Sequence, residues 1–192
     1  MKGIPTVYKE RNMRSRLEAR WAAMFDLLSW DWEYEPFDLE GWIPDFVIYG
    51  AKEEIIVEVK PYSRLDQYDI EKIKKGIRGT EKEGTDILLV GSRLIAQDIW
   101  NPPCPSIGFL GDGSWCEEYD FEPAVWLRST MDNSDEKIGF FHPTGRYADR
   151  ITGAYSGDHH IGRVEEWEIC SYWAEAGNVT QWKKDKAYVA TT

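Results

Sequence analysis

The chain has 192 residues, of which 42% are hydrophobic and 14% aromatic, and it carries a formal net charge of −11. This composition excludes a disordered or low-complexity chain and predicts a globular protein with a substantial core. No apolar stretch is long enough to span a bilayer and no signal-like segment opens the chain, so we expect no membrane association and a cytoplasmic, intracellular location. Cys104, Cys116 and Cys170 are spaced too irregularly for a disulfide framework or a zinc site, and we expect buried or half-buried thiols.

The charge is unevenly distributed along the chain. Residues 1–20 carry a net charge of +4 and residues 60–84 a net charge of +2, so the rest of the chain is strongly acidic. The overall charge argues against a polyanionic ligand such as DNA. A local positive surface is still compatible with the sequence, because the two basic segments flank Asp45 and Glu58.

A first helix is predicted from Ser15 to about Leu28. Ser15 and Glu18 have the spacing of a capping box, in which a serine oxygen and a glutamate carboxylate satisfy free amides of the first turn. Glu18 also falls at the edge of the apolar stripe, so we expect its carboxylate where the helix meets the sheet. Its function is therefore either that of a cap partner or that of a site residue. The stripe is formed by Leu17, Trp21, Met24, Phe25 and Leu28.

Two apolar runs, residues 46–49 and 55–59, predict a β-hairpin with a loop of four residues between them. If Tyr49 pairs with Glu54, Asp45 lies opposite Glu58, and Lys60 shares their face because side chains alternate along a strand. Directly opposed residues have Cβ atoms about 4.5–5.5 Å apart. Two carboxylates at that distance repel each other unless a positive charge lies between them.

A divalent cation is the natural counter-charge for this pair, since Mg²⁺ is commonly held by one or two carboxylates and keeps reactive waters. Lys60 could then orient a water or stabilise charge that develops on a phosphate. The alternative is ordinary: Asp45 ends a turn after Pro44, and Glu58 and Lys60 line the solvated face of an edge hairpin.

The predicted fold is α/β, with a mixed central sheet flanked by helices. A strand is expected at residues 32–37 and a helix at residues 63–82, which is ended by Gly84 and buries Leu65, Ile70, Ile73 and Ile77. A strand at residues 85–91 is expected to lie parallel to the second hairpin strand after this helical crossover. We assign residues 1–91 to a core.

Residues 92–192 are assigned to a C-terminal extension of short strands and a helix, of unknown role and packed on the same domain. Short strands are predicted at residues 107–110, 124–127 and 138–141, and a loop at residues 145–162. A last helix is predicted at residues 164–176, ended by the Gly177-Asn178 pair. Its buried side is expected to be Val164, Trp167, Cys170, Ser171 and Ala174.

The order of Glu18 on a helix, Pro44-Asp45, and Glu58-Val59-Lys60 before a helix and a strand resembles the PD-(D/E)XK nuclease superfamily. The surroundings of Glu18 are similar to the first helix of small phage-encoded nucleases and, more distantly, of TnsA-type endonucleases. The resemblance covers residues 8–91 and implies a restriction-endonuclease-like core. It implies a metal-dependent endonuclease that hydrolyses DNA phosphodiester bonds in phage or mobile-element DNA processing.

The resemblance also implies a role for each residue of the motif. Asp45 and Glu58 would bind the catalytic Mg²⁺, which Mn²⁺ can replace, with the carbonyl of Val59 as a further ligand. Glu18 would complete the acidic cluster, directly or through a water. Lys60 would activate the attacking water and stabilise the pentacovalent phosphate, and the products would carry a 5′-phosphate and a 3′-hydroxyl.

DNA is the expected partner, together with a second copy of the chain or an accessory protein. Phosphate contacts are assigned to the basic residues of the two flanking segments, although for any single one of them a solvated helix face is the simpler explanation. A second hypothesis is a non-catalytic acidic protein with the same fold, which imitates the charge of DNA and binds a host DNA-processing protein. The basic residues are Arg14, Arg16, Arg20, Lys72 and Lys75.

Overall fold

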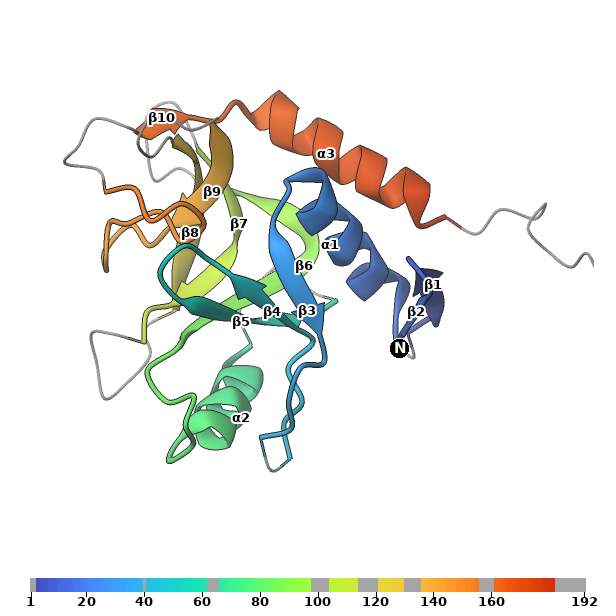
Figure 1. The fold of residues 1–192 in the computed structure, drawn as a ribbon, viewed down its shortest axis with the longest axis vertical. Helices are drawn as coiled ribbons and strands as arrows, with labels where there is room; N and C mark the ends of the chain where they lie inside the picture. The colour runs from blue at the N-terminus through green and yellow to red at the C-terminus, as the bar shows by residue number, and fades with distance from the viewer. Residues whose placement is uncertain are drawn as a thin grey trace, which may run out of the picture.

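The structure is a computed structural model that describes residues 3–39, 41–61, 66–97, 104–113, 121–129, 136–155 and 161–181. Within these ranges the protein is a mixed α/β fold, in which a curled sheet of eight strands carries three helices (Figure 1). None of the helices in this described part combines the length and the apolar character that a membrane crossing requires.

The sheet runs from the C-terminal strands to the N-terminal ones. All of its neighbouring strands are antiparallel except β5 and β6, which are parallel, and β9 pairs with β8 beside the main path. A separate hairpin is formed by β1 (Thr6–Tyr8) and β2 (Arg11–Met13). The order in the sheet is β10 (Ile161–Arg163), β8 (Phe121–Ser129), β7 (Cys104–Gly111), β6 (Asp86–Gln97), β5 (Glu54–Val59), β4 (Phe46–Tyr49) and β3 (Asp31–Tyr34), with β9 at Lys137–Phe141.

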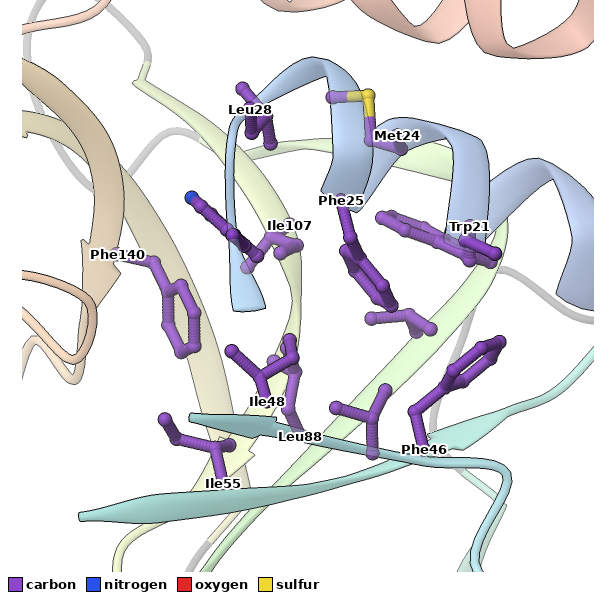
Figure 2. Close-up of a cluster of buried hydrophobic side chains, with 14 of the residues drawn as sticks. Trp21, Met24, Phe25, Leu28, Phe46, Ile48, Ile55, Leu88, Ile107 and Phe140 are labelled. Carbon is purple, nitrogen blue, oxygen red and sulfur yellow. The ribbon is translucent and has the colours of Figure 1, made fainter. Parts of the chain in front are cut away.

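Helix α1 (Arg16–Leu27) starts where the sequence predicts. The Ser15 hydroxyl accepts a hydrogen bond from the Glu18 peptide N–H at 3.1 Å, as an N-cap residue does. The apolar stripe of α1 lies on the sheet, where Figure 2 shows Trp21 and Phe25 above Phe46 and the neighbouring aliphatic side chains. Burying this stripe is what holds the start of α1 against the ends of β4 and β5.

The register of the β4–β5 hairpin is confirmed, with Tyr49 opposite Glu54 and Phe46 opposite Val57. Alternation then separates two cores. Phe46 and Val57 belong to the cluster under α1, whereas Val47 and Ile56 belong to a second cluster on the opposite face. Both faces of the hairpin are therefore buried, and β4 and β5 are inner strands rather than the exposed edge hairpin of the alternative interpretation.

Helices cover both faces of the sheet. Helices α1 and α3 (Glu166–Val179) lie side by side on one face, and α2 (Gln67–Ile77) lies on the other (Figure 1). The Arg20 guanidinium joins the first two, because it donates to the Trp173 carbonyl at 2.7 and 3.1 Å and stacks on the Trp173 ring at 3.8 Å.

Helix α2 is shorter than predicted. It begins at Gln67, where the Asp66 side chain accepts from the Tyr68 N–H at 2.9 Å, and ends at Ile77. The predicted end at Gly84 is wrong, because Gly79 already takes a left-handed conformation (φ 73°) that helices commonly use to end. Ile70, Ile73 and Ile77 are buried as expected, whereas residues 62–65, with Leu65, lie outside the described residues. The strand predicted at residues 32–37 is also shorter, because Glu35 takes a positive φ of 47°.

The parallel pairing of β5 and β6 is confirmed. The predicted boundary at residue 91 falls inside β6, which continues to Gln97 and pairs there with β7. The three short strands predicted after it exist as β7, β8 and β9 and extend the same sheet. The predicted loop at residues 145–162 contains the start of β10, and its Arg150 is buried in ion pairs with Asp86 and Asp112.

Helix α3 turns a different face to the core than predicted. Val164, just before the helix, is buried as predicted. Within α3, however, Ile169 and Ala176 are buried, whereas Trp167 is 71% exposed and Cys170 is exposed. The rest of the predicted buried side and the expected buried thiol are therefore wrong. Cys116 lies outside the described residues. The helix also runs through Gly177 instead of ending there. A Cβ atom at Gly177 would lie 3.1 Å from the Arg20 guanidinium, so this glycine provides room for the Arg20 contact.

The orientation of α3 predicts that replacing two of its large apolar residues will change the stability of the protein by very different amounts. Ile169→Ala should lower the free energy of unfolding by about 2–5 kcal/mol, because it leaves a cavity between α3 and the sheet. Trp167→Ala should change it by about 0.5 kcal/mol or less, since the ring is already in solvent. Urea titration of both variants measures this difference. A larger loss for Trp167→Ala than for Ile169→Ala would contradict the orientation.

Candidate active site

A pocket of about 510 Å³ opens where the start of α1, the start of β4, the end of β5 and α2 meet. The four residues predicted as catalytic, Glu18, Asp45, Glu58 and Lys60, all line it. Residues that are far apart in the sequence are therefore brought together by the hairpin register and by the packing of α1. The other lining residues are Gly3, Arg14, Ser15, Asp38, Gly41, Trp42, Ile43, Val59 and Lys72.

Asp45 stands directly before β4 and is only 5% exposed. Its Oδ2 accepts a hydrogen bond from the Val59 peptide N–H at 2.7 Å, and its Oδ1 accepts from the Arg14 guanidinium at 2.7 Å. The first of these bonds ties the side chain to the end of β5. The second brings in a cation from the residue that precedes the α1 cap.

Glu58 is 7% exposed on β5. Its Oε2 accepts from the indole N–H of Trp42 at 2.9 Å, and its Oε1 lies 2.9 Å from Nζ of Lys60. The Trp42 ring belongs to the cluster under α2, so the indole fixes the carboxylate from a buried position. Glu58 is held by one neutral donor and one charged donor.

Glu18 takes part in the cap of α1 and also lines the pocket. Its Oε1 accepts from the Ser15 hydroxyl at 2.7 Å, and its Oε2 accepts from the Arg14 peptide N–H at 3.0 Å and from the Tyr34 hydroxyl at 2.6 Å. The carboxylate thus stabilises the start of α1 while it lines the pocket. Burial, together with the hydrogen bond to Glu18, raises the pKa of Tyr34 to about 12, so the phenol stays protonated.

Lys60 is half-buried between two acids. Its Nζ lies 2.9 Å from Oε1 of Glu58 and 3.3 Å from Oδ1 of Asp69, a residue of α2. Burial alone lowers the pKa of Lys60, but the charges and hydrogen bonds of Glu58 and Asp69 outweigh it and raise the pKa. Lys60 is therefore a cation at neutral pH. In this state it can donate hydrogen bonds and offset negative charge, but it cannot accept a proton.

The burial of Asp45 affects its pKa. Loss of hydration raises its pKa to about 7, the charge of Glu58 adds to this rise, and the Val59 N–H opposes it. Arg14 and Glu18 act on it more weakly and in opposite directions. At neutral pH Asp45 is therefore only partly ionised, and a cation bound to its carboxylate would favour the ionised form.

The buried carboxylates of the pocket suit a hard divalent cation, because Mg²⁺ prefers oxygen ligands and is often bound by only one or two carboxylates. Asp45 and Glu58 are the ligands that the sequence predicts, and Val59 lies beside them. In the part of the chain that the structure describes, however, no three His, Cys, Asp or Glu side chains are grouped closely enough to hold a metal ion. A cation at Asp45 and Glu58 would displace donors that now occupy their oxygens.

Sequence reasoning missed three residues that contact the charged groups of the pocket: Trp42, which also lines it, and Tyr34 and Asp69. Trp42 is the one that a local signal could have indicated, since it lies two residues before Pro44-Asp45. Tyr34 and Asp69 come from β3 and α2, and only the tertiary fold brings them to Glu18 and Lys60.

The residues predicted to bind DNA are placed differently from one another. Arg14 lies in the site, where it pairs with Asp45 and also with Glu35 at 2.7 Å. Arg20 is engaged by α3. Arg16, Lys72 and Lys75 are exposed, and of these Lys72 lines the pocket.

Comparison of the chain with protein-family models, with curated proteins and with solved structures finds no match. The chemistry of the pocket is therefore interpreted from its own residues.

The raised pKa of Asp45 predicts a pH-dependent effect of Asp45→Asn on stability. Asp45 ionises at about 3.8 in the unfolded chain and at about 7 in the folded protein. Between these values the folded protein holds a proton that the unfolded chain has released, so the wild type loses stability as pH rises toward 7. The variant lacks this loss. Its free energy of unfolding, relative to the wild type, should rise by about 1–3 kcal/mol between about pH 5 and pH 8.

Urea titrations in EDTA at several pH values measure this difference. Asp38→Asn is the control, because it removes a carboxylate of the same pocket that is less buried. A difference between Asp45→Asn and the wild type that stays constant with pH would contradict the raised pKa.

Proposed function

We propose that the protein is a metal-dependent deoxyribonuclease with a restriction-endonuclease-like core. The observation that carries the proposal is the convergence of Glu18, Asp45, Glu58 and Lys60 on one pocket, with all three carboxylates at most 7% exposed. Burying like charges together is costly for stability, and a catalytic metal site gives a reason to maintain it. The order α1, β3, β4, β5, α2, β6 with a parallel β5–β6 pair also supports such a core.

Mg²⁺, or Mn²⁺ in its place, would be held by Asp45 and Glu58, with the Val59 carbonyl as a further ligand, and would supply a water of lowered pKa and charge to offset the phosphate. The residues of the chain account for the remaining requirements. Lys60 is kept protonated by Glu58 and Asp69, so it can donate to the attacking water or to a phosphate oxygen. Glu18 adds a fixed acceptor beside them.

In the proposed reaction a water attacks phosphorus and the bond to the 3′ oxygen breaks. The water releases one proton to solvent, the 3′ oxygen takes up one proton from solvent as it leaves as a hydroxyl, and the phosphate stays on the 5′ side. A cation such as Lys60 stabilises the charge that builds up on the phosphate oxygens. Arg14 and Lys72, at the lining of the same pocket, are positioned to contact neighbouring phosphates. These local cations allow an acidic protein to receive DNA.

Replacement of site residues should abolish cleavage. We expect Asp45→Asn and Lys60→Met to reduce Mg²⁺-dependent cleavage of plasmid, linear duplex and single-stranded DNA by about 100-fold or more. The first would remove a proposed metal ligand, and the second would remove a cation that stabilises charge on the phosphate. Lys82→Met is a matched control, because Lys82 forms the same kind of pair with Glu54 at the opposite end of β5, 2.5 Å apart and away from the pocket. Gel assays with Mg²⁺, Mn²⁺ and EDTA measure the effect.

Equal cleavage by Lys60→Met, Lys82→Met and the wild type would exclude the proposed site. Absence of cleavage by the folded wild type, together with no Mn²⁺ binding in calorimetry, would instead favour a non-catalytic acidic protein that binds a DNA-processing partner. One observation supports this second function: every oxygen of Asp45 and Glu58 already has a protein donor. A domain that serves only as a charge mimic can keep such a closed network.

Arg14 should compete with the metal. Its guanidinium occupies Oδ1 of Asp45, so Arg14→Gln should bind Mn²⁺ more tightly than the wild type, by about 2- to 10-fold for a partly exposed ion pair. Calorimetry at about pH 8.5 measures this while Asp45 is ionised. Arg16→Gln is the control, because Arg16 is an exposed arginine near the same helix end. Weaker or unchanged Mn²⁺ binding by Arg14→Gln would contradict the competition.

A further inference from the structure

The solvent face of α2 carries an aromatic ring and two lysines in line. Tyr68, Lys72 and Lys75 fall within an arc of about 60° on the helix, opposite to the buried Ile70 and Ile73. Tyr68 is 77% exposed and has the largest exposed fraction among the large hydrophobic residues that the structure describes. The ring therefore contributes little to the core, and its exposure has no packing explanation.

This face is continuous with the pocket. Lys72 lies one turn after Tyr68 and lines the pocket, and Asp69, next to Tyr68, pairs with Lys60. The Tyr68 peptide N–H is held by the Asp66 side chain at the helix start, so the backbone that presents the ring is fixed. The face therefore meets the pocket at its middle residue, Lys72.

The charge of the face is positive although the protein is acidic. Among the described residues, neither Lys72 nor Lys75 takes part in an ion pair, unlike Lys60 and Lys82. The nearest acid on this side of α2, Glu71, accepts a hydrogen bond from the Gln67 amide at 3.1 Å. Two available cations therefore follow the ring, rising about 6 and 10.5 Å along the helix axis.

An exposed ring followed by cations suits a strand whose bases are unpaired. Aromatic side chains stack on base faces, which are available in single strands but covered in a duplex, while lysines follow the phosphates. We propose that the Tyr68–Lys72–Lys75 face binds single-stranded DNA that leads into the pocket, with one base stacked on Tyr68. This inference rests on the proposed nuclease function, and it names the substrate class of that site.

Binding of fluorescent oligothymidylate of about twelve nucleotides, a length within the range of single-strand sites, tests the proposal by anisotropy in EDTA. Tyr68→Ala should weaken this binding by about 5- to 100-fold, while Tyr68→Phe should bind like the wild type because its ring still stacks. Lys72→Gln should weaken binding and make the affinity depend less steeply on salt concentration, because one phosphate contact is lost. Lys74→Gln, off this face, is the matched control. Thermal unfolding verifies that the variants are folded.

An abasic oligonucleotide of equal length isolates the stacking. It should bind the wild type and Tyr68→Ala equally, because no base is present to stack. The inference would be overturned if Tyr68→Ala and the wild type bound oligothymidylate equally, or if the wild type did not bind it. It would also be overturned if Tyr68→Ala lost as much affinity for duplex DNA as for oligothymidylate. Tighter Tyr68-dependent binding of oligouridylate would overturn the assignment to DNA.

Failure of this inference and failure of the nuclease proposal give different results. Cleavage that depends on Asp45 and Lys60, combined with single-strand binding that is insensitive to Tyr68, counts only against the α2 face. Tyr68-dependent binding without cleavage under any metal condition counts only against the nuclease.

Discussion

The hydrogen bond from the Val59 peptide N–H to the Asp45 carboxylate is one of the contacts that connect the candidate site to the sheet. It continues the pairing of β4 and β5 one step beyond the last paired residues, but with a charged side chain as the acceptor. Because the hairpin register fixes which residues alternate inward, the same bond sets Glu58 and Lys60 toward the pocket. A slip of one residue would turn these two side chains into the core under α1 and dismantle the site.

The pocket is stabilised by a balance of charges rather than by apolar contact. Glu18, Asp45 and Glu58 are buried, and they are compensated by Arg14, Lys60 and neutral donors such as Trp42. Networks of this kind are worth more than their separate bonds when complete and are costly when one member is missing. In the proposed function a metal ion would take the place of the Arg14 guanidinium at Asp45 within this network.

The local parts of the fold could be predicted, and the long-range parts could not. The capping serine of α1, the hairpin register and the parallel β5–β6 pair follow from alternation and turn chemistry. The orientation of α3 does not, since its sequence offers apolar residues on two sides, and tertiary contacts such as Arg20–Trp173 select one. Tyr34 donates to Glu18 and Asp69 pairs with Lys60, but these two residues come from β3 and α2, whose positions no local pattern encodes.

The contact between α1 and α3 joins residues 153 positions apart in the chain, and this separation has a consequence for folding. The pocket itself is assembled from Gly3 to Lys72, so its contacts close much shorter loops. Long loops close more slowly, and the sheet and pocket should form before α3 docks. Until then the side of Trp21 that contacts the Trp173 ring, with centroids 4.6 Å apart, faces water. A chain emerging from the ribosome thus carries an assembled site but an open core, and the last helix completes its protection against aggregation.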